Sequence, residues 1–246
     1  MLKSIYYLIK VLFHPDKRLM RKKFKKKGDM ISFTMDGRNV KVKVDGKHVE
    51  YESYEDWRRL QELKGDPEWL ERLWENLKEK HLSFYDFAEL KADHRVLDVG
   101  FRDGYNLKYL QKTGMDITGI EVNRYAIEHA KQMGLNVFYD DIQTRTQFTD
   151  ESFDVILLCD VFEHLFAPDA ALDECIRLIK TNGKIVLEVP LETEFSENVL
   201  HGHAFLFYSE ECFEKMLNNH SLRVEKTSWY DAKYRVVARL NMEFLV

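Results

Sequence analysis

The segment that most constrains the fold of this chain runs from Arg95 to Leu107. An apolar run ends at Asp98 and Gly100, a second glycine follows at Gly104, and helical apolar spacing begins at Leu107. A strand, a glycine loop and a helix in this order are typical of the first unit of a nucleotide-binding α/β sheet. Glycine lets the backbone approach a ligand closely, and the next helix N-terminus offers free N–H groups.

From residue 95 onward, strand-length apolar runs alternate with helical patterns, which is typical of a parallel sheet. We predict strands at 95–99, 116–121, 136–139, 153–159 and 184–190. A helical stripe of four apolar residues precedes the fifth strand and is expected to stop at Asn182-Gly183: Leu172, Cys175, Ile176 and Ile179. A helix at 209–219 and two closing strands at 222–229 and 234–240 follow.

The first 90 residues lack the alternation of strand and helix patterns that is seen from residue 95 onward. Alternating apolar residues between 31 and 51, with Asp-Gly pairs at 36–37 and 45–46, predict a three-stranded meander. Two helical stripes follow, separated by Gly65-Asp66-Pro67, and a further short helix is expected near 83–91. The aromatic residues of these helices are expected to pack as core. We therefore predict an N-terminal extension, 1–90, and a main domain, 91–246.

Charge is unevenly distributed along the chain. The net charge is −5, yet residues 1–30 hold ten basic and two acidic side chains, so the remaining 216 residues carry −13. An acidic body with a basic arm does not have the profile of a nucleic-acid-binding surface, and no nucleic-acid partner is expected. Three cysteines without a C-x-x-C pair indicate a reduced, cytoplasmic protein without a zinc module.

The basic arm comprises residues 1–27. Apolar residues at 2–13 share one helical face, too short and too interrupted by lysine to span a bilayer, and a lysine-rich run follows. An apolar face beside basic residues suits an anionic membrane surface, so peripheral contact with the inner membrane is one expectation. The alternative is that the arm covers its own domain or docks a partner, because periodicity alone does not separate these roles.

Acidic residues stand where the second and third predicted strands end. Glu121 lies 21 residues after Gly100, where a carboxylate can accept ribose hydroxyls. Asp141 follows the third strand and can accept an adenine amino group, while Ile142 can lie against the ring.

These segments together resemble the class I S-adenosylmethionine (SAM) methyltransferases. That family usually carries acid-x-G-x-G-x-G, and Arg102 stands here at the middle glycine. The run from Phe153 to Pro190, with Glu163-His164-Leu165 after the fourth strand, and the segment from His203 to Glu211 resemble the ubiquinone-biosynthesis-like branch. The resemblance covers 95–230. It implies a Rossmann-like sheet of seven strands with the last antiparallel, helices on both faces, and SAM as methyl donor.

The resemblance and the spacing together nominate site residues. The expected cofactor-binding residues are Asp98, Gly100, Arg102, Gly104, Glu121, Asp141, Ile142 and Cys159. His164 and His203 are candidate general bases, because a neutral histidine can take a proton from a hydroxyl acceptor near pH 7; either histidine can instead hydrogen-bond loop backbone. His201 and His203 are spaced like strand metal ligands but have no third ligand in register, so no metal is expected.

The predicted function is methyl transfer to a small-molecule, sugar or lipid-linked acceptor, expected on oxygen. No N-P-P-Y-like tetrapeptide follows the fourth strand, which disfavours DNA and protein-amide substrates. Two alternatives stay open. Arg102 in the glycine loop is compatible with a SAM-binding protein without turnover. A nicotinamide oxidoreductase is the other, and the missing third glycine of G-x-G-x-x-G argues against it.

Overall fold

The structure is a computed structural model that describes residues 29–35, 38–44, 49–51, 53–63, 67–191 and 209–241. The predicted basic arm, 1–27, and the candidate residues His201 and His203 lie outside the described residues. Within the described part, no helix is both long and apolar enough to cross a membrane.

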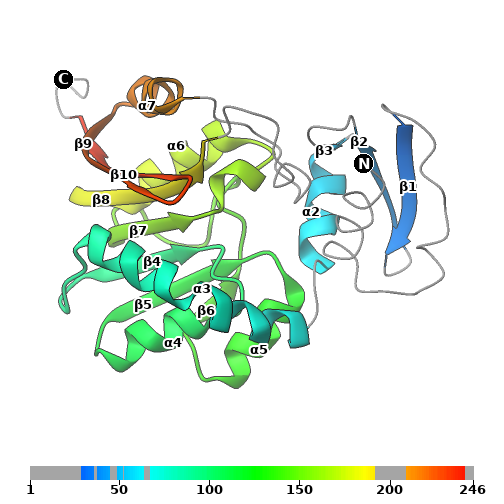
Figure 1. Ribbon diagram of the computed structural model, residues 1–246, viewed down its shortest axis with the longest axis horizontal. Coiled ribbons are helices and arrows are strands. Elements are labelled where there is room, and N and C mark those ends of the chain that lie inside the picture. Colours follow the sequence, from blue (N-terminus) through cyan, green and yellow to red (C-terminus); the bar gives the residue numbers. More distant parts are fainter. Residues whose placement is uncertain are drawn as a thin grey trace.

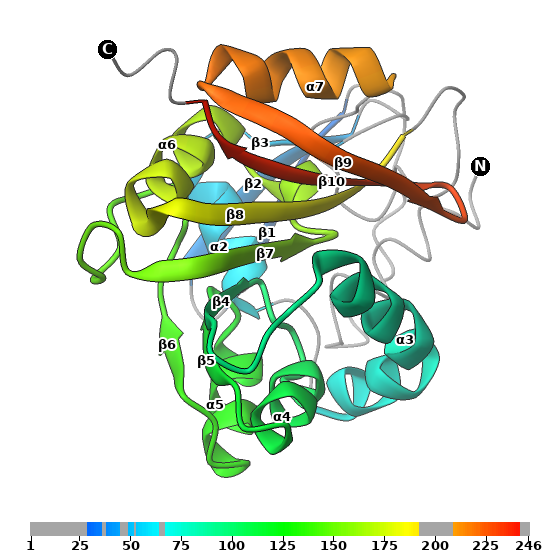
Figure 2. The ribbon, with the colours of Figure 1, turned by 90° about the vertical axis from the view of Figure 1, so that its left-hand side faces the viewer.

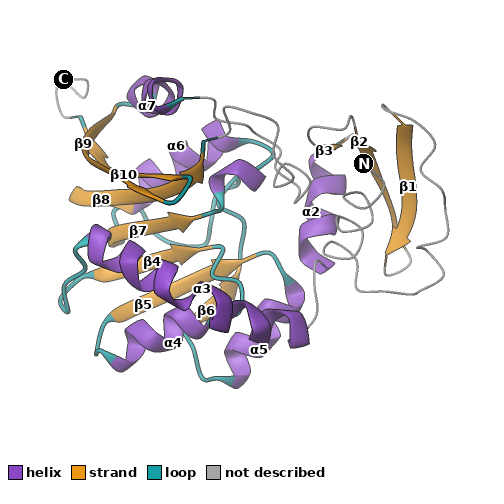
Figure 3. Cartoon of the chain, in the orientation of Figure 1, coloured by secondary structure: helices purple, strands orange, loops and turns teal. Residues whose placement is uncertain are grey.

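A seven-stranded sheet forms the centre of the molecule, and Figure 3 shows its strands in orange. The strand order is β6-β5-β4-β7-β8-β10-β9, and β10 runs antiparallel to both of its neighbours. The predicted seven-stranded sheet with an antiparallel last strand is therefore confirmed. The strands are β4 (Arg95–Val99), β5 (Asp116–Glu121), β6 (Val137–Tyr139), β7 (Phe153–Cys159), β8 (Ile179–Pro190), β9 (Leu222–Tyr230) and β10 (Lys233–Leu240).

Helices cover both faces of this sheet, as predicted. Successive residues of β7 point to opposite faces: Val155 and Leu157 pack with α3 (Pro67–Ala88), α4 (Tyr105–Lys112) and α5 (Arg124–Gln132). Ile156 and Leu158 pack with α6 (Pro168–Leu178) and α7 (Glu210–Asn219). Figure 2 shows α3 and α4 on one side of the strands and α6 on the other. Burial on both faces explains why the middle of a strand such as β7 is a continuous apolar run, Val155–Leu158.

The N-terminal residues form the predicted meander. Strands β1 (Asp29–Met35), β2 (Arg38–Val44) and β3 (Val49–Tyr51) pair antiparallel in the order β1-β2-β3. Helix α2 (Tyr54–Leu63) follows and lies between this small sheet and the large one (Figure 1). The carboxyl ends of the parallel strands face α2, since Trp57 and Gln61 of this helix line one cavity together with Val99 and Glu121 at the strand ends.

Two expectations about element boundaries were wrong. The separate helix expected near 83–91 does not form: residues 83–88 are the end of α3, which continues from Pro67 to Ala88 because no glycine or proline interrupts it after its first residue. The helix expected to stop at Asn182-Gly183 ends at Leu178, and Ile179 already belongs to β8. The pairing of β7 with β8 shifts register between Phe153, opposite Ile179, and Val155, opposite Lys184. Gly183 lies in this irregular part of β8, where a Cβ would lie 2.7 Å from Cγ1 of Ile179.

Candidate active site

Two adjoining cavities lie at the carboxyl edge of the sheet, where open α/β sheets bind ligands. The larger cavity encloses about 750 Å³, open solvent at its mouth included, and lies over the ends of β4, β5 and β6. The smaller cavity, about 380 Å³, lies between the glycine loop and α3. Gly100, Arg102 and Asp160 line both cavities, so these residues mark the junction.

The glycine loop turns sharply through left-handed backbone. Gly100 has φ +70° and Arg102, at the middle-glycine position, has φ +55°. A Cβ on Gly100 would lie 2.7 Å from Cγ2 of Val161, so this glycine is needed for close approach as well as for its φ. Gly104 differs from the expectation: it starts α4 with φ +77°, but it lines neither cavity and instead abuts side chains of α5 and its end.

Glu121 lines the larger cavity at the end of β5, as expected. Its carboxylate accepts backbone N–H bonds from Val122 at 2.8 Å, Asn123 at 3.0 Å and Arg102 at 3.2 Å. Burial raises the pKa of Glu121, and these three bonds oppose that rise. The bond from Arg102 fixes the glycine loop relative to β5, so Arg102 contributes through its backbone even without being a glycine.

Asp98 lies in the smaller cavity and is buried. Its Oδ2 accepts a 2.6 Å hydrogen bond from Nδ2 of Asn106. Burial, followed by the charges of Glu121 and Asp103, raises the pKa of Asp98 to about 8. This carboxyl group is therefore mostly protonated at neutral pH unless a cation binds beside it.

Asp141 and Ile142 both line the larger cavity after β6, as expected. Oδ1 of Asp141 accepts from the backbone N–H of Gln143 at 2.9 Å and from its side-chain amide at 3.0 Å. Oδ2 accepts from the hydroxyl of Tyr54 on α2. These hydrogen bonds fix the orientation of the Asp141 carboxylate on the cavity wall, so Asp141 is not simply a solvated loop residue.

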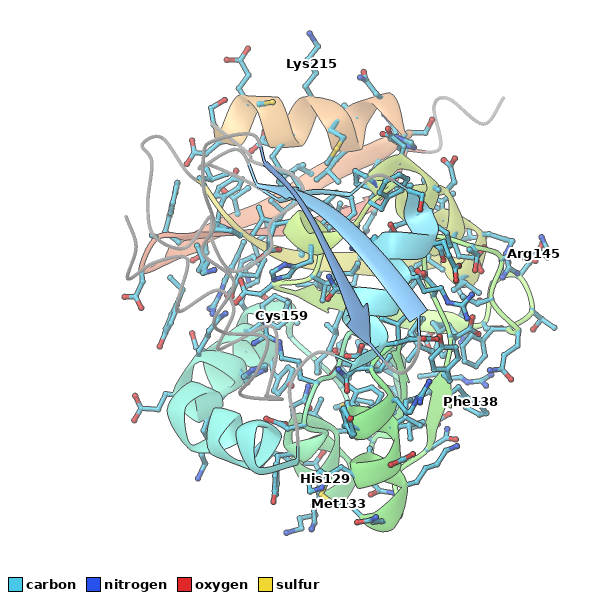
Figure 4. All side chains as sticks on the ribbon, turned by 90° about the vertical axis from the view of Figure 1, so that its right-hand side faces the viewer. His129, Met133, Phe138, Arg145, Cys159 and Lys215 are labelled. Atoms are coloured by element: carbon cyan, nitrogen blue, oxygen red, sulfur yellow. The ribbon has the colours of Figure 1, made fainter. Side chains whose placement is uncertain are left out.

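Strand β7 ends at Cys159, which lines the smaller cavity and is labelled near the centre of Figure 4, and the next residue, Asp160, lines both cavities. Burial raises the pKa of the Cys159 thiol, so it is neutral. Asp160 has φ +52° and pairs with Lys80 of α3 and with Lys233, whose Nζ lies 2.9 Å from Oδ1. Burial alone would raise the pKa of Asp160, but these two ammonium groups outweigh it and hold the pKa below its ordinary range.

His164 lines the larger cavity from a 3₁₀ turn, Phe162–His164, that follows β7. Its backbone carbonyl accepts a 2.6 Å hydrogen bond from Nε1 of Trp57. The structure therefore brings His164 together with every cofactor-binding residue predicted from the sequence except Gly104. The other candidate base, His203, stays a prediction.

Several residues that line the cavities were not nominated from the sequence, among them Trp57, Gln61, Lys80, His81 and Asp160. Asp160 directly follows a predicted strand, so its position could have nominated it; the other four come from helices whose docking has no local sequence signal. His81 is notable because burial, followed by the charges of Lys80 and Arg102, lowers its pKa to about 4. Its Nδ1 is buried, and no hydrogen-bond partner for it is found among the described residues.

Comparison with known proteins decides the family. Residues 67–227, more than half of the chain, match the methyltransferase domain family. The chain belongs to this family. Ubiquinone biosynthesis O-methyltransferase of Coxiella burnetii is 35% identical over 102 residues, 39% of this chain and 43% of that protein. Its counterpart in Actinobacillus pleuropneumoniae is 30% identical over 112 residues, 40% and 48% of the two chains. The chain thus spans less than half the length of these curated relatives.

A SAM-dependent methyltransferase from Aquifex aeolicus shares the fold with this class I domain. It superposes with a TM-score of 0.56 at 23% identity and covers 71% of this chain and 98% of its own. The cofactor that membership of the family implies is S-adenosyl-L-methionine.

The residues of the site fit this cofactor. The cavities are lined by the carboxyl groups of Asp98, Glu121, Asp141 and Asp160. Such a lining suits ribose hydroxyls, an adenine amino group, an ammonium group and a sulfonium cation, and it does not suit the pyrophosphate of a nicotinamide dinucleotide. Lys80 and Arg102 in the smaller cavity suit a carboxylate. The nicotinamide alternative is therefore not supported.

Proposed function

We propose that this protein transfers a methyl group from SAM to an oxygen atom of a small-molecule, sugar or lipid-linked acceptor. The observation that carries the proposal is the junction of two cavities of different chemistry at Gly100, Arg102 and Asp160. The larger cavity has the acceptors that a nucleoside needs, and the smaller cavity has the mixed charges that an amino-acid group needs. The names of the curated relatives, which are O-methyltransferases, support oxygen as the acceptor atom.

Each cavity assigns its residues a role in holding the cofactor. Glu121 would accept a hydrogen bond from a ribose hydroxyl, and Asp141 would accept one from the adenine amino group. Ile142 would cover the adenine ring. In the smaller cavity, Asp98 would face the ammonium group, while Arg102 and Lys80 would face the carboxylate. When bound, SAM supplies a methyl group activated by its sulfonium. The ionised Asp160 lies at the junction, where its carboxylate stabilises positive charge.

The chain's own contribution to chemistry is positioning and proton removal. Holding the acceptor in line with the methyl group supplies most of the rate enhancement. An oxygen nucleophile must also lose its proton, and His164 on the cavity wall is the described residue best placed to accept it. The hydrogen bond from Trp57 fixes the backbone of the turn that carries His164.

Turnover on a metabolite extract tests this proposal. The purified protein is incubated with SAM and fractions of a small-molecule or lipid extract, and S-adenosylhomocysteine (SAH) is quantified by mass spectrometry. We expect SAH to form with the acceptor-containing fraction and not with protein and SAM alone; a Glu121→Ala variant provides the cofactor-binding control. Saturable SAM binding without SAH formation in any fraction would indicate a SAM-binding protein without turnover.

We further propose that residues 1–27 bring the site to an anionic lipid surface. The support is the sequence: an apolar helical pattern followed by a lysine-rich run, with each basic residue contributing about 1 kcal/mol near such a surface. Sedimentation with anionic and neutral vesicles tests this contact. The full-length protein should pellet with anionic vesicles at low salt, and a protein that stays in the supernatant of both would contradict it.

A further inference from the structure

Helix α2 lies outside residues 67–227, which define the family match, yet it closes one side of the larger cavity. Trp57 and Gln61 belong to the cavity wall. Three hydrogen bonds tie this helix to three different loops of the sheet edge. The Tyr54 hydroxyl donates to Asp141, and the Trp57 indole donates to the backbone carbonyl of His164. Nδ2 of Asn123 donates to the backbone carbonyl of Gln61 at 3.1 Å. A helix that served only as a linker would not need to reach each of these loops.

The contact to Asp141 determines how that carboxylate is presented. A carboxylate has about four acceptor positions. Gln143 occupies two at Oδ1 through its backbone and side-chain amides, and Tyr54 occupies one at Oδ2. The Gln143 side-chain amide also reaches Oδ2, at the longer distance of 3.4 Å. This long contact is the weakest of the four, so its position on Oδ2 is the one that a ligand donor can take. Burial and the neighbouring Asp141 charge raise the pKa of Tyr54, so its hydroxyl keeps its proton and acts as a donor.

Aromatic packing holds the Tyr54 hydroxyl in place. The rings of Tyr54 and Trp57 are stacked, with centroids 5.7 Å apart and planes at 21°. Phe166 meets the Tyr54 ring edge-on at 6.0 Å. Trp57 is 2% exposed, and its indole N–H is fixed on the His164 carbonyl. The Tyr54 ring is therefore held between Trp57, which is part of the cavity wall, and Phe166.

We propose that Tyr54 of α2 is a specificity-determining residue of the cofactor site, because it orients Asp141 to accept the 6-amino group of adenine. Hypoxanthine carries an oxygen at that position, so a second acceptor would face the Asp141 carboxylate in place of the N–H donor that adenine supplies. Tyr54 acts through Asp141 and is a positioning residue. This inference rests on the proposed function, since it takes a SAM-type nucleoside as the ligand of the larger cavity.

Binding selectivity between SAH and S-inosylhomocysteine, measured by calorimetry, tests the proposal. Wild-type protein should prefer SAH by about 10-fold or more, the range expected when a buried charge loses its hydrogen-bond donor. Tyr54→Phe should reduce this preference at least about threefold, and Asp141→Asn should reduce it further. The double variant should match Asp141→Asn alone, because the two residues act in one pathway. Tyr109→Phe, an exposed tyrosine on α4, is the matched control and should leave both affinities unchanged.

Two results would overturn the inference while leaving the proposed function intact. One is wild-type protein that binds both nucleosides equally, a result that needs no variant. The other is a Tyr54→Phe protein that keeps wild-type selectivity, or that loses affinity for both ligands by the same factor, as a purely structural wall would. If wild-type protein binds neither nucleoside, the proposed function itself fails along with the inference.

Discussion

Replacing Glu121 with alanine should weaken cofactor binding by an amount that follows from its contacts. A carboxylate has about four acceptor positions, and three of those on Glu121 are taken by the backbone N–H groups of Arg102, Val122 and Asn123. One position is left for a full hydrogen bond to a ribose hydroxyl. A hydrogen bond to a charged group is worth about 1.5–3 kcal/mol, which corresponds to roughly a 10- to 150-fold loss of affinity.

Isothermal titration with SAH measures this loss directly. Glu128→Ala, an exposed acid on the next helix, is the matched control and should bind like wild type. Circular dichroism establishes that the Glu121→Ala protein is folded, which matters because three backbone donors lose their acceptor. A folded Glu121→Ala protein with wild-type affinity for SAH would refute the assignment of Glu121 to the ribose.

Three further predictions concern other parts of the site. His164→Ala should lower turnover by about 10²–10⁴-fold while SAH affinity stays near wild type, and unchanged turnover by SAH quantification would exclude His164 as the base. Gly100→Ala should lower the free energy of unfolding in urea by more than Gly134→Ala does. Both glycines have a left-handed φ, +70° and +74°, but only at Gly100 would the added Cβ meet a side chain, that of Val161, at 2.7 Å. Equal losses in the two variants would count against this close contact. Asp98→Asn should gain stability relative to wild type as the pH rises from about 4 to 8, because the native carboxyl, with a pKa of about 8, keeps a proton that the unfolded chain, near 3.8, has lost; parallel stability profiles in chemical denaturation would contradict this.

The part of the site formed by the end of β4 and the glycine loop was predictable from the sequence. Val99 and Gly100 mark the end of a buried strand and a left-handed turn, and both follow from their neighbours in the chain. Gly104 starts the next helix, as its sequence position predicted, but it lines neither cavity. Glu121 was predictable for the same reason, since the end of a parallel strand must lie at the carboxyl edge of the sheet. Arg102 was an exception to the glycine pattern, and the structure accommodates it in the same left-handed conformation.

The residues that reach the site from α2 and α3 were not predictable. Helical periodicity identifies which face of a helix is buried, but it does not say which loop that face meets. Trp57 was expected to pack as core, and it does so while also lining a cavity. Lys80 lies in α3 just before the segment expected to form a separate helix, and it pairs with Asp160 and, at 2.8 Å, with Glu188. The buried position of Lys80 could not be predicted from the helix alone, because the acidic partners that stabilise it are far away in the sequence.

We propose that the two adjoining cavities form one site for a SAM-type cofactor. Calorimetric titration of the wild-type protein with SAM, with SAH and, in parallel, with NAD tests it most directly. We predict saturable binding of SAM and SAH with one site per chain, and no saturable binding of NAD. A folded protein that binds neither SAM nor SAH, or that binds NAD more tightly than either, would contradict this account.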